Sequence, residues 1–306
     1  MFEILKIDKE TVKVCKKVEQ DCWINIIEPT DEDIKKLKSH IEVTDEIINS
    51  LKDGDEIPTT EEHATFSFII IRTPYNHPKS EPSYTTQPLG IILNDKFVVT
   101  ICFEKNDAVE KLKTLPFDFK KSQFVLRLLL KSSRLYLVYL KDIHKKMIIL
   151  QEEIEVSQKN KVIMNFLELE TSLVYFDTSL KSNYILLENI KKNMKVMKYK
   201  ENFQILDQIE EETKQGIQMT EVYSNILSNT LDAFASIISN NLNIVMKTLT
   251  SLTLIFSIPM LIASIYGMNV DLPYGHARFA FIFVMLMSLI LSVIAAYVFA
   301  KKKFFG

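Results

Sequence analysis

The chain has 306 residues, of which 25% are charged and 47% hydrophobic, and its formal net charge is −2 at pH 7. This length fits one large or two modest domains. A mean hydropathy of +0.06 is high for a soluble protein with so many charges, and it indicates a soluble part joined to a membrane part. The absence of a net basic charge argues against nucleic acid as a partner.

Cysteine usage and the N-terminal sequence both indicate a cytosolic soluble part. Cys15, Cys22 and Cys102 form no C-x-x-C pair and leave an odd count. This pattern argues against a disulfide framework or a zinc site and favours a reducing compartment. The segment Met1–Glu10 lacks the apolar core of a signal peptide, so we expect the N-terminal part to stay in the cytoplasm.

Residues 1–118 are predicted to form a cytosolic α/β domain. Helical spacing runs from Ile34 to Leu51, with Thr44 as a candidate cap within it. Runs rich in β-branched and aromatic residues predict strands over 66–72, 89–93 and 97–103.

The prediction for this domain includes one hairpin and one loop. Asn94 and Asp95 separate the last two predicted strands and indicate a tight turn. The segment 74–88, which is rich in Pro, Ser and Thr, is predicted to be a polar loop.

Residues 119–200 are predicted to form an antiparallel helix pair. Between Pro116 and Pro259 there is no proline, and Gly216 is the only glycine. A run of this length without helix breakers is typical of long helices. We expect helices over 120–157 and 160–197, with their charged residues on solvated faces.

A third helix, predicted from Glu201 to Tyr266, would be about 100 Å long at 1.5 Å per residue. Its cytosolic part, residues 201–246, is expected to act as a stalk, and residues 247–306 to form a membrane hairpin. The run Glu210–Glu212 on the stalk is interpreted as solvated.

Two uncharged segments, 248–266 and 279–300, are each long enough to cross the hydrocarbon core. The alternative is a buried helix pair in a soluble core, which two adjacent segments of this length make unattractive. Lys247 precedes the first segment and Lys301–Lys303 follow the second. The positive-inside rule therefore predicts that both termini are cytoplasmic. We expect a multi-pass protein of the cell inner (plasma) membrane.

One face of the first span is unusually polar for a membrane helix. Its members follow the 3–4 spacing of a coiled-coil seam, and they are Asn243, Met246, Thr250, Thr253, Ser257, Met260 and Ser264. Such a face must lie against another helix or against water. Contacts between helices through small hydroxyl residues and a water-filled pore both fit this pattern. Asn243 at one end and Asn269 beyond the other favour a pore, which one hairpin cannot enclose without a symmetric oligomer.

The sequence Tyr266-Gly267-Met268-Asn269 directly follows the first span. A Gly-Met-Asn loop after a long stalk helix, between two C-terminal spans and before a lysine-rich tail, resembles the CorA family of magnesium transporters. The resemblance covers the whole chain, and residues 240–306 carry its specificity. It implies an α+β membrane protein that assembles as a homopentamer in the lipid bilayer, with the first span lining the pore.

The resemblance also implies roles for individual residues. Asn269 would supply amide oxygens to an outer selectivity ring, Gly267 would permit the turn, and Met268 and Tyr266 would support it. The implied pore-lining residues are Asn243, Met246, Leu249, Thr250, Thr253, Ser257, Met260 and Ser264. Met246 and Leu249 would form a hydrophobic constriction near the cytosolic mouth.

The chemistry of a neutral amide ring suits Mg²⁺. This ion loses its water reluctantly and prefers octahedral oxygen ligands. Amides can hydrogen-bond to its water shell without stripping it, and conduction requires binding from which the ion can escape. We therefore expect Mg²⁺ as the main ion, with Co²⁺ and Ni²⁺ as secondary ions.

No nucleotide-binding or zinc-protease motif and no catalytic constellation occurs, so an enzyme is not expected. Passive flow suffices, because a divalent ion crossing about 100 mV gains roughly 4–5 kcal/mol. The resemblance implies that Mg²⁺ bound between the cytosolic domains of neighbouring subunits closes the pore. Asp207 approximately matches a family position on the stalk, and Asp53 is a plausible partner; both also fit ordinary surface carboxylates.

Two other functions fit parts of the pattern. One is a zinc or other divalent-cation transporter on the same scaffold. The other is a membrane-tethered coiled-coil scaffold without a pore. The scaffold hypothesis predicts a dimer or trimer and leaves Gly-Met-Asn unexplained.

Overall fold

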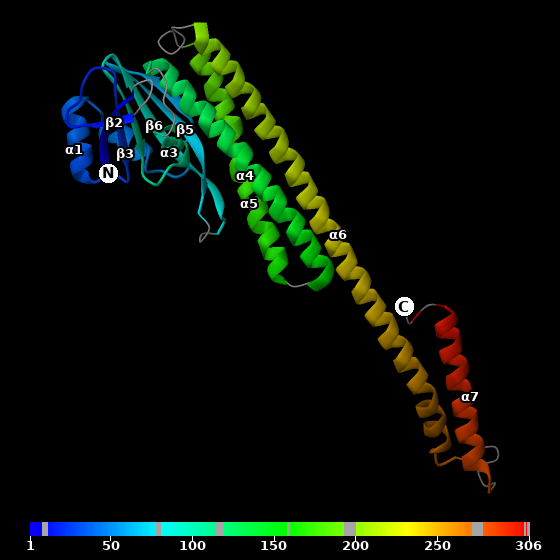
Figure 1. Cartoon of the computed structure of the whole chain (residues 1–306). Coiled ribbons are helices and arrows are strands. Elements are labelled where there is room, and N and C mark those ends of the chain that lie inside the picture. Colours follow the sequence, from blue (N-terminus) through cyan, green and yellow to red (C-terminus); the bar gives the residue numbers. More distant parts are fainter. Residues whose placement is uncertain are drawn as a thin grey trace. The chain divides into compact units, whose positions relative to one another are not determined.

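The computed structural model of the chain describes residues 1–7, 12–77, 81–113, 119–157, 160–192, 200–270, 278–302 and 304. The chain divides into two compact units, Met1–Ser228 and Asn229–Gly306 (Figure 1). Parts of several predicted segments lie outside the described residues. They are 8–10 of the N-terminal segment, 78–80 of the predicted polar loop, 114–118 of the α/β domain, 158–159 between the two long helices, 193–199 of the second long helix, 271–277 of the connecting loop, and Lys303 of the lysine tail.

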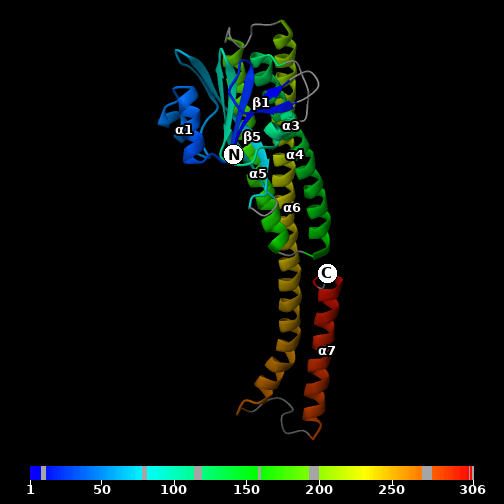
Figure 2. The ribbon, with the colours of Figure 1, turned by 60° about the vertical axis from the view of Figure 1, so that its left-hand side comes forward.

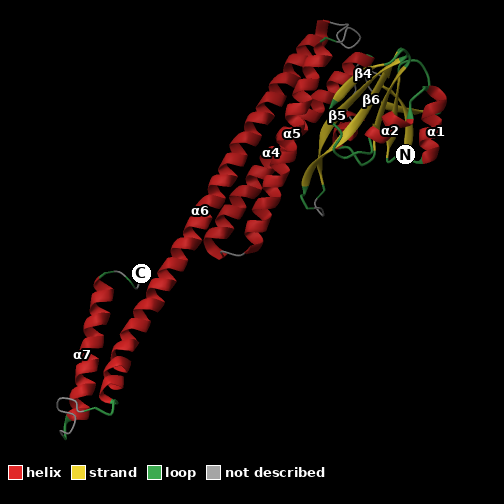
Figure 3. Ribbon diagram, turned by 180° about the vertical axis from the view of Figure 1, so that it is seen from behind, coloured by secondary structure: helices red, strands yellow, loops and turns green. Residues whose placement is uncertain are grey.

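The first unit contains a seven-stranded sheet with the order β2-β1-β3-β7-β6-β5-β4 (Figure 3). Neighbouring strands are antiparallel except β3 and β7, which run parallel. The strands are β1 (Phe2–Ile7), β2 (Val12–Cys15), β3 (Cys22–Ile27), β4 (Thr59–Glu62), β5 (Phe66–Asn76), β6 (Tyr84–Asn94) and β7 (Phe97–Cys102).

The predicted hairpin is confirmed as β6 and β7. The Asn94 side-chain oxygen accepts the N–H groups of Lys96 and Phe97 at 2.8 and 2.7 Å. Asparagine is common in tight turns because its side chain can accept hydrogen bonds from backbone N–H groups that follow it closely in the chain.

The predicted polar loop over 74–88 is wrong at both ends, because β5 runs to Asn76 and β6 begins at Tyr84, while 78–80 lie outside the described residues. Strands β5 and β6 continue into it, and Pro74 pairs with Thr86. Strand β4 pairs with β5 only as far as Ile70, so Pro74 lies where β5 is an edge strand. An edge strand tolerates proline because one of its sides need not donate hydrogen bonds.

Helices α1 (Asp31–His40) and α2 (Asp45–Ser50) cover one face of the sheet (Figure 1). The helical spacing predicted over 34–51 thus belongs to two short helices. Thr44 caps the second one, as expected, since its hydroxyl oxygen accepts the Ile47 N–H at 3.4 Å. The core on this face contains the strand residues Ile24, Ile26, Phe68, Ile70, Ile92 and Val99. From the helical side it contains Leu37 of α1, Ile47 and Ile48 of α2, and Leu51, which directly follows α2.

The other face of the sheet carries α3 (Asp107–Lys113), α4 (Lys121–Ser157) and α5 (Asn160–Lys191) (Figure 2). Alternation along β3 sends Trp23 to this face, where its ring lies 4.9 Å from that of Phe124 of α4. The long helix pair predicted from proline spacing is therefore observed as α4 and α5.

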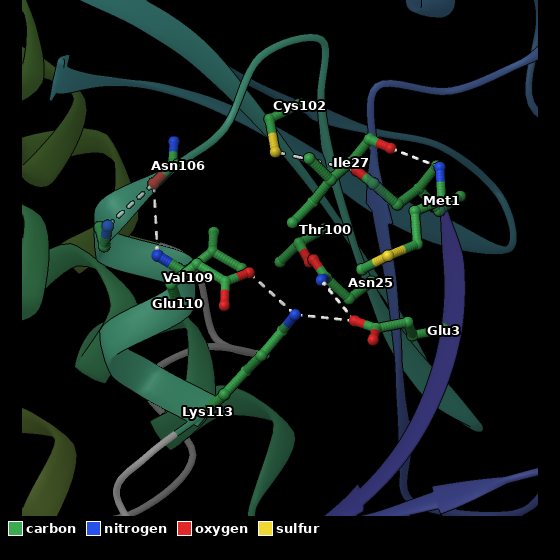
Figure 4. A network of polar contacts seen from close by, with 12 residues as sticks. Met1, Glu3, Asn25, Ile27, Thr100, Cys102, Asn106, Val109, Glu110 and Lys113 are labelled. Atoms are coloured by element: carbon green, nitrogen blue, oxygen red, sulfur yellow. Dashed lines mark hydrogen bonds and ion pairs between the residues drawn. The ribbon is translucent and has the colours of Figure 1, made fainter. Parts of the chain in front are cut away.

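A buried polar network lies between the sheet and α3 (Figure 4). Lys113 bonds Glu3 of β1 at 2.7 Å and Glu110 of its own helix at 2.9 Å. Asn25 of β3 donates to Glu3 at 3.3 Å and accepts from Thr100 of β7 at 2.8 Å. These bonds satisfy polar groups that would be costly to bury alone.

All three cysteines, Cys15, Cys22 and Cys102, are free. Burial raises the pKa of the Cys102 thiol to about 12. A thiol of this kind is unreactive and is a poor metal ligand at neutral pH.

Two helices extend into the second unit: the C-terminal part of α6 (Lys200–Tyr266) and the whole of α7 (Ala280–Lys301). Both are long and apolar enough to cross a membrane. Large side chains such as Phe281 and Met260 are more than 70% exposed in the single chain. Apolar surface of this extent is expected to be covered by lipid or by other subunits.

Candidate ion pathway

The Gly-Met-Asn segment begins where α6 ends. The N–H of Gly267 donates to Ala263 O at 2.9 Å, and that of Met268 donates to Ile265 O at 3.2 Å, so the helix turns out into the loop here. A Cβ on Gly267 would lie 3.3 Å from the Ala263 carbonyl oxygen, which favours glycine at this position. Asn269 follows as an exposed residue, and no hydrogen bond to its amide is found among the described residues.

The polar seam predicted on the first span is exposed at all seven positions from Asn243 to Ser264. Leu249, which borders this seam, is exposed as well. Thr253 and Ser257 donate their hydroxyl protons to carbonyl oxygens of their own helix, Leu249 O at 2.9 Å and Thr253 O at 2.7 Å. Their donors are therefore satisfied without another helix, and their oxygen lone pairs remain available to water.

Helix α7 packs on the opposite side of α6. The α6 residues that face it include Ser251, which is fully buried, and Ile258 and Ile262, which line a shared apolar surface with Leu291 and Ile294. At 100° per residue the mean direction of these positions lies about a third of a turn, roughly 130°, from that of the seam. The seam is thus left uncovered by its own hairpin, so contact with it must come from another subunit or from solvent.

Pro259 lies inside this helix and interrupts its hydrogen bonds. A proline has no N–H, so the carbonyl four residues earlier, that of Ile255, loses its partner within the helix. The Ser292 hydroxyl of α7 donates to this oxygen at 3.5 Å. A polar group of α7 therefore compensates for the break, as is required where lipid offers no hydrogen bonds.

The two predicted regulatory carboxylates lie on different elements of the first unit. Asp53 is exposed in the loop after α2, and one of its carboxylate oxygens accepts the Asp55 N–H at 3.0 Å. Asp207 is exposed on α6, which contacts α4 through Thr213 and Ser133 on the far face of the sheet from α2. One chain does not bring them together, and no cluster of three potential metal ligands among His, Cys, Asp and Glu occurs in the described residues.

The neighbouring acidic run is not simply solvated, contrary to the sequence interpretation. Glu210 bonds Lys191 of α5 at 2.6 Å and Lys214 at 2.7 Å, and it accepts a bond from the Tyr184 hydroxyl at 3.2 Å. Glu212 accepts from Arg134 of α4 at 3.1 Å. These two residues attach α6 to the helix pair. The Lys214 partner could have been found from its i+4 spacing, whereas Lys191 is brought close only by the fold.

A family model described as CorA-like Mg²⁺ transporter protein matches residues 19–302 of this chain. The cobalt/magnesium transport protein CorA of Methanocaldococcus jannaschii is 29% identical over 290 residues, which cover 92% of this chain and 90% of that protein. The protein of the same name from Thermotoga maritima is 22% identical over 311 residues, covering 98% and 88%.

Solved structures of other proteins share the fold of the chain. The complete structure of the CorA magnesium transporter from M. jannaschii superposes with a TM-score of 0.87 at 25% identity and covers 98% of both chains. The cytoplasmic domain of ZntB from Vibrio parahaemolyticus shares the fold at a TM-score of 0.60 and 10% identity, covering 78% of this chain and 98% of that one.

Proposed function

Because the chain belongs to the family of CorA-like Mg²⁺ transporter proteins, we propose that it carries divalent cations passively across a membrane. The expected main ion is Mg²⁺, with Co²⁺ and Ni²⁺ as secondary ions. The observation that carries this proposal is the exposed polar seam on α6, which α7 leaves open and which ends at Gly267-Met268-Asn269.

The proposed pathway requires several copies of the chain. One seam can form only part of a wall, so we propose a homopentamer in which α6 of every subunit faces the common axis. Asn243, Thr250, Thr253, Ser257 and Ser264 then present oxygen atoms to a column of water. Met246, Leu249 and Met260 place apolar side chains along the same path, and the first two narrow it near the cytosolic end.

The proposed filter is a ring of Asn269 amides outside the membrane, next to Met268 and held by Gly267 and Tyr266. Neutral amide oxygens can accept hydrogen bonds from the first water shell of Mg²⁺, so the ion need not pay the cost of dehydration at entry. Since the ring carries no charge, the ion also leaves it readily. We place the protein in the inner (plasma) membrane of the cell, with both termini in the cytoplasm.

The proposed gate uses Mg²⁺ itself. Asp53, in the loop after α2, and Asp207, on α6, both have exposed carboxylates, as is needed if Asp53 of one subunit meets Asp207 of the next. A shared ion would hold neighbouring subunits together and keep the pore closed while cytosolic Mg²⁺ is high. When the ion leaves, like charges face one another and the contact weakens.

The filter is tested by ion flux into liposomes that contain the purified protein. Asn269→Ala is expected to abolish Mg²⁺ uptake, because the alanine ring offers no oxygen to the hydrated ion. Asn241→Ala, which lies off the seam, is the matched control and should retain uptake. Normal flux through a correctly assembled Asn269→Ala protein would refute the filter.

The same assay separates the alternatives. Mg²⁺, Co²⁺, Ni²⁺ and Zn²⁺ are compared under one membrane potential. Flux of Zn²⁺ without Mg²⁺ would identify a zinc transporter on this scaffold, and absence of flux for every ion would favour a scaffold protein without a pore.

A further inference from the structure

Arg72 of β5 is a buried cation at the centre of a hydrogen-bonded hub in the first unit. The residue is only 8% exposed. Its Nη1 donates to Gly54 O and Glu56 O at 2.6 and 3.1 Å, and its Nη2 donates to the carbonyl and hydroxyl oxygens of Thr86 at 3.1 and 2.9 Å. Its Nε lies 3.0 Å from Thr86 Oγ1 and 3.1 Å from Ser179 Oγ, so all five N–H donors have acceptors.

The acceptors that surround this guanidinium in the described part of the chain are uncharged oxygens. Two of them belong to the backbone of the loop that carries Asp53. Because the Gly54 and Glu56 carbonyls point inward to Arg72, the loop is fixed with the Asp53 and Asp55 side chains exposed. Only the flat, forked guanidinium can hold both carbonyls while it bonds to Thr86 and Ser179; an ammonium group lacks this geometry.

The same residue is attached to α5. The side chain of Asn183 accepts the Arg72 backbone N–H at 3.0 Å and donates to the Arg72 carbonyl at 2.7 Å. Ser179, one turn earlier on α5, bonds the Arg72 side chain. The loop of Asp53 and one face of α5 are therefore connected through a single residue.

Helix α5 in turn holds α6 near Asp207. Tyr184 and Lys191 of α5 both bond Glu210, which lies one helical turn after Asp207. A continuous series of packed, hydrogen-bonded groups thus leads from the Asp53 loop through Arg72 and α5 to the Asp207 turn of α6. Coupling between distant sites requires physical contacts of this kind, although contacts alone do not demonstrate it.

We propose that Arg72 is a positioning residue that couples the Asp53 loop to α5 and, through Glu210, to α6. The inference rests on the proposed regulatory ion between Asp53 and Asp207. Binding of Mg²⁺ at the Asp53 loop is then felt by α6 of the same subunit, and each subunit communicates between its two intersubunit contacts. Arg72 does not bind the ion.

The test is protection of the full-length purified protein from trypsin across a Mg²⁺ titration. Ser179→Ala removes the hydroxyl that bonds Arg72 Nε at 3.1 Å and Thr86 Oγ1 at 2.8 Å, and it leaves both Asn183 bonds to the Arg72 backbone in place. We expect it to raise the Mg²⁺ concentration for half-protection at least about threefold. A shift of this size corresponds to the loss of the net free energy of one modest hydrogen bond. Ser182→Ala is the matched control, since the Ser182 hydroxyl bonds only Thr178 O of its own helix in the described contacts, at 2.8 Å.

Arg72→Lys is the second variant and keeps the charge while losing the fork. We expect a larger shift in half-protection than in Ser179→Ala. The thermal midpoint measured with and without Mg²⁺ distinguishes coupling from a merely structural role. Coupling predicts that Mg²⁺ raises the midpoint of Ser179→Ala less than it raises that of Ser182→Ala, whereas a merely structural role lowers the Ser179→Ala midpoint by the same amount with and without Mg²⁺.

Asp53→Asn separates failure of this inference from failure of the proposed regulation. If Asp53→Asn is protected at the wild-type Mg²⁺ concentration, the regulatory pair is wrong and the coupling falls with it. If Asp53→Asn loses protection but Ser179→Ala titrates like Ser182→Ala, the regulatory pair stands and the coupling through Arg72 is overturned.

Discussion

Glu210 illustrates how the environment of one carboxylate changes its chemistry. Hydrogen bonds from Lys191 and Lys214 lower the pKa of this carboxyl from 4.5 to about 2. A depressed pKa means that the folded state prefers the ionised form more than the unfolded state does. Its contribution to stability is therefore fully present above about pH 4.5 and is lost as the pH falls towards about 2.

Glu210→Gln is expected to destabilise the first unit by about 1 kcal/mol at pH 7, because Lys214 loses its carboxylate partner and Lys191 keeps only Glu188. The difference from wild type should shrink between pH 4.5 and 2, as the wild-type carboxyl becomes protonated. Chemical denaturation of both proteins at several pH values measures this difference in the free energy of unfolding. Glu211→Gln, on the exposed side of the same run, is the control and should lower the stability less. Equal losses of stability in the two variants would contradict the role of Glu210 in joining α6 to α5.

At the scale of elements, the break at Pro259 shows how α6 and α7 depend on each other. The Ser292 hydroxyl reaches the carbonyl that the proline leaves without a partner. Ser288, one turn earlier on α7, instead bonds Met285 O within its own helix at 2.9 Å. Two serines on one helix therefore have different tasks, one between helices and one local.

Ser292→Ala is expected to destabilise the membrane hairpin by about 1 kcal/mol, since it leaves the Ile255 carbonyl unsatisfied in an apolar environment. The thermal midpoint of the purified protein in detergent should fall. Ser288→Ala should have a smaller effect because it removes a bond that is local to its own helix. If the midpoint of Ser292→Ala is no lower than that of Ser288→Ala, the hydrogen bond from Ser292 to the Ile255 carbonyl does not stabilise the hairpin as proposed.

The sheet shows where local pattern and fold disagree. Proline and polar residues over 74–88 are typical of a loop, yet most of this segment belongs to β5 and β6. The deciding feature is that β4 and β7 do not reach this end of the hairpin, so the prolines at 74 and 88 cost no ladder hydrogen bond. Local propensity cannot reveal where a neighbouring strand ends.

At the scale of the whole molecule, the exposed seam predicts the symmetry of the assembly. If five seams face one axis, the purified protein should have five times the 35.5 kDa mass of the chain. Thr253→Cys should form disulfides between subunits more readily than Leu252→Cys, which lies off the seam. Native mass measurement and cross-linking test both points, and a dimer or trimer would contradict the proposed pore.

The sequence alone was sufficient to predict the long helices, the two apolar spans and the Gly-Met-Asn loop with its polar seam. These features are encoded locally, because helix periodicity, proline spacing and uncharged length need no distant partner. The family resemblance rested on the same local signals, and the family match agrees with it.

The tertiary structure decided what depends on contacts distant in sequence. It turned Glu210 from a residue predicted to be solvated into one that joins α6 to α5, and it buried Arg72 between a loop, two strands and α5. Partners up to 111 residues apart, as for Arg72 and Asn183, leave no periodic trace in the sequence. Such pairs are selected by the packing of the whole domain, so only the folded chain reveals them.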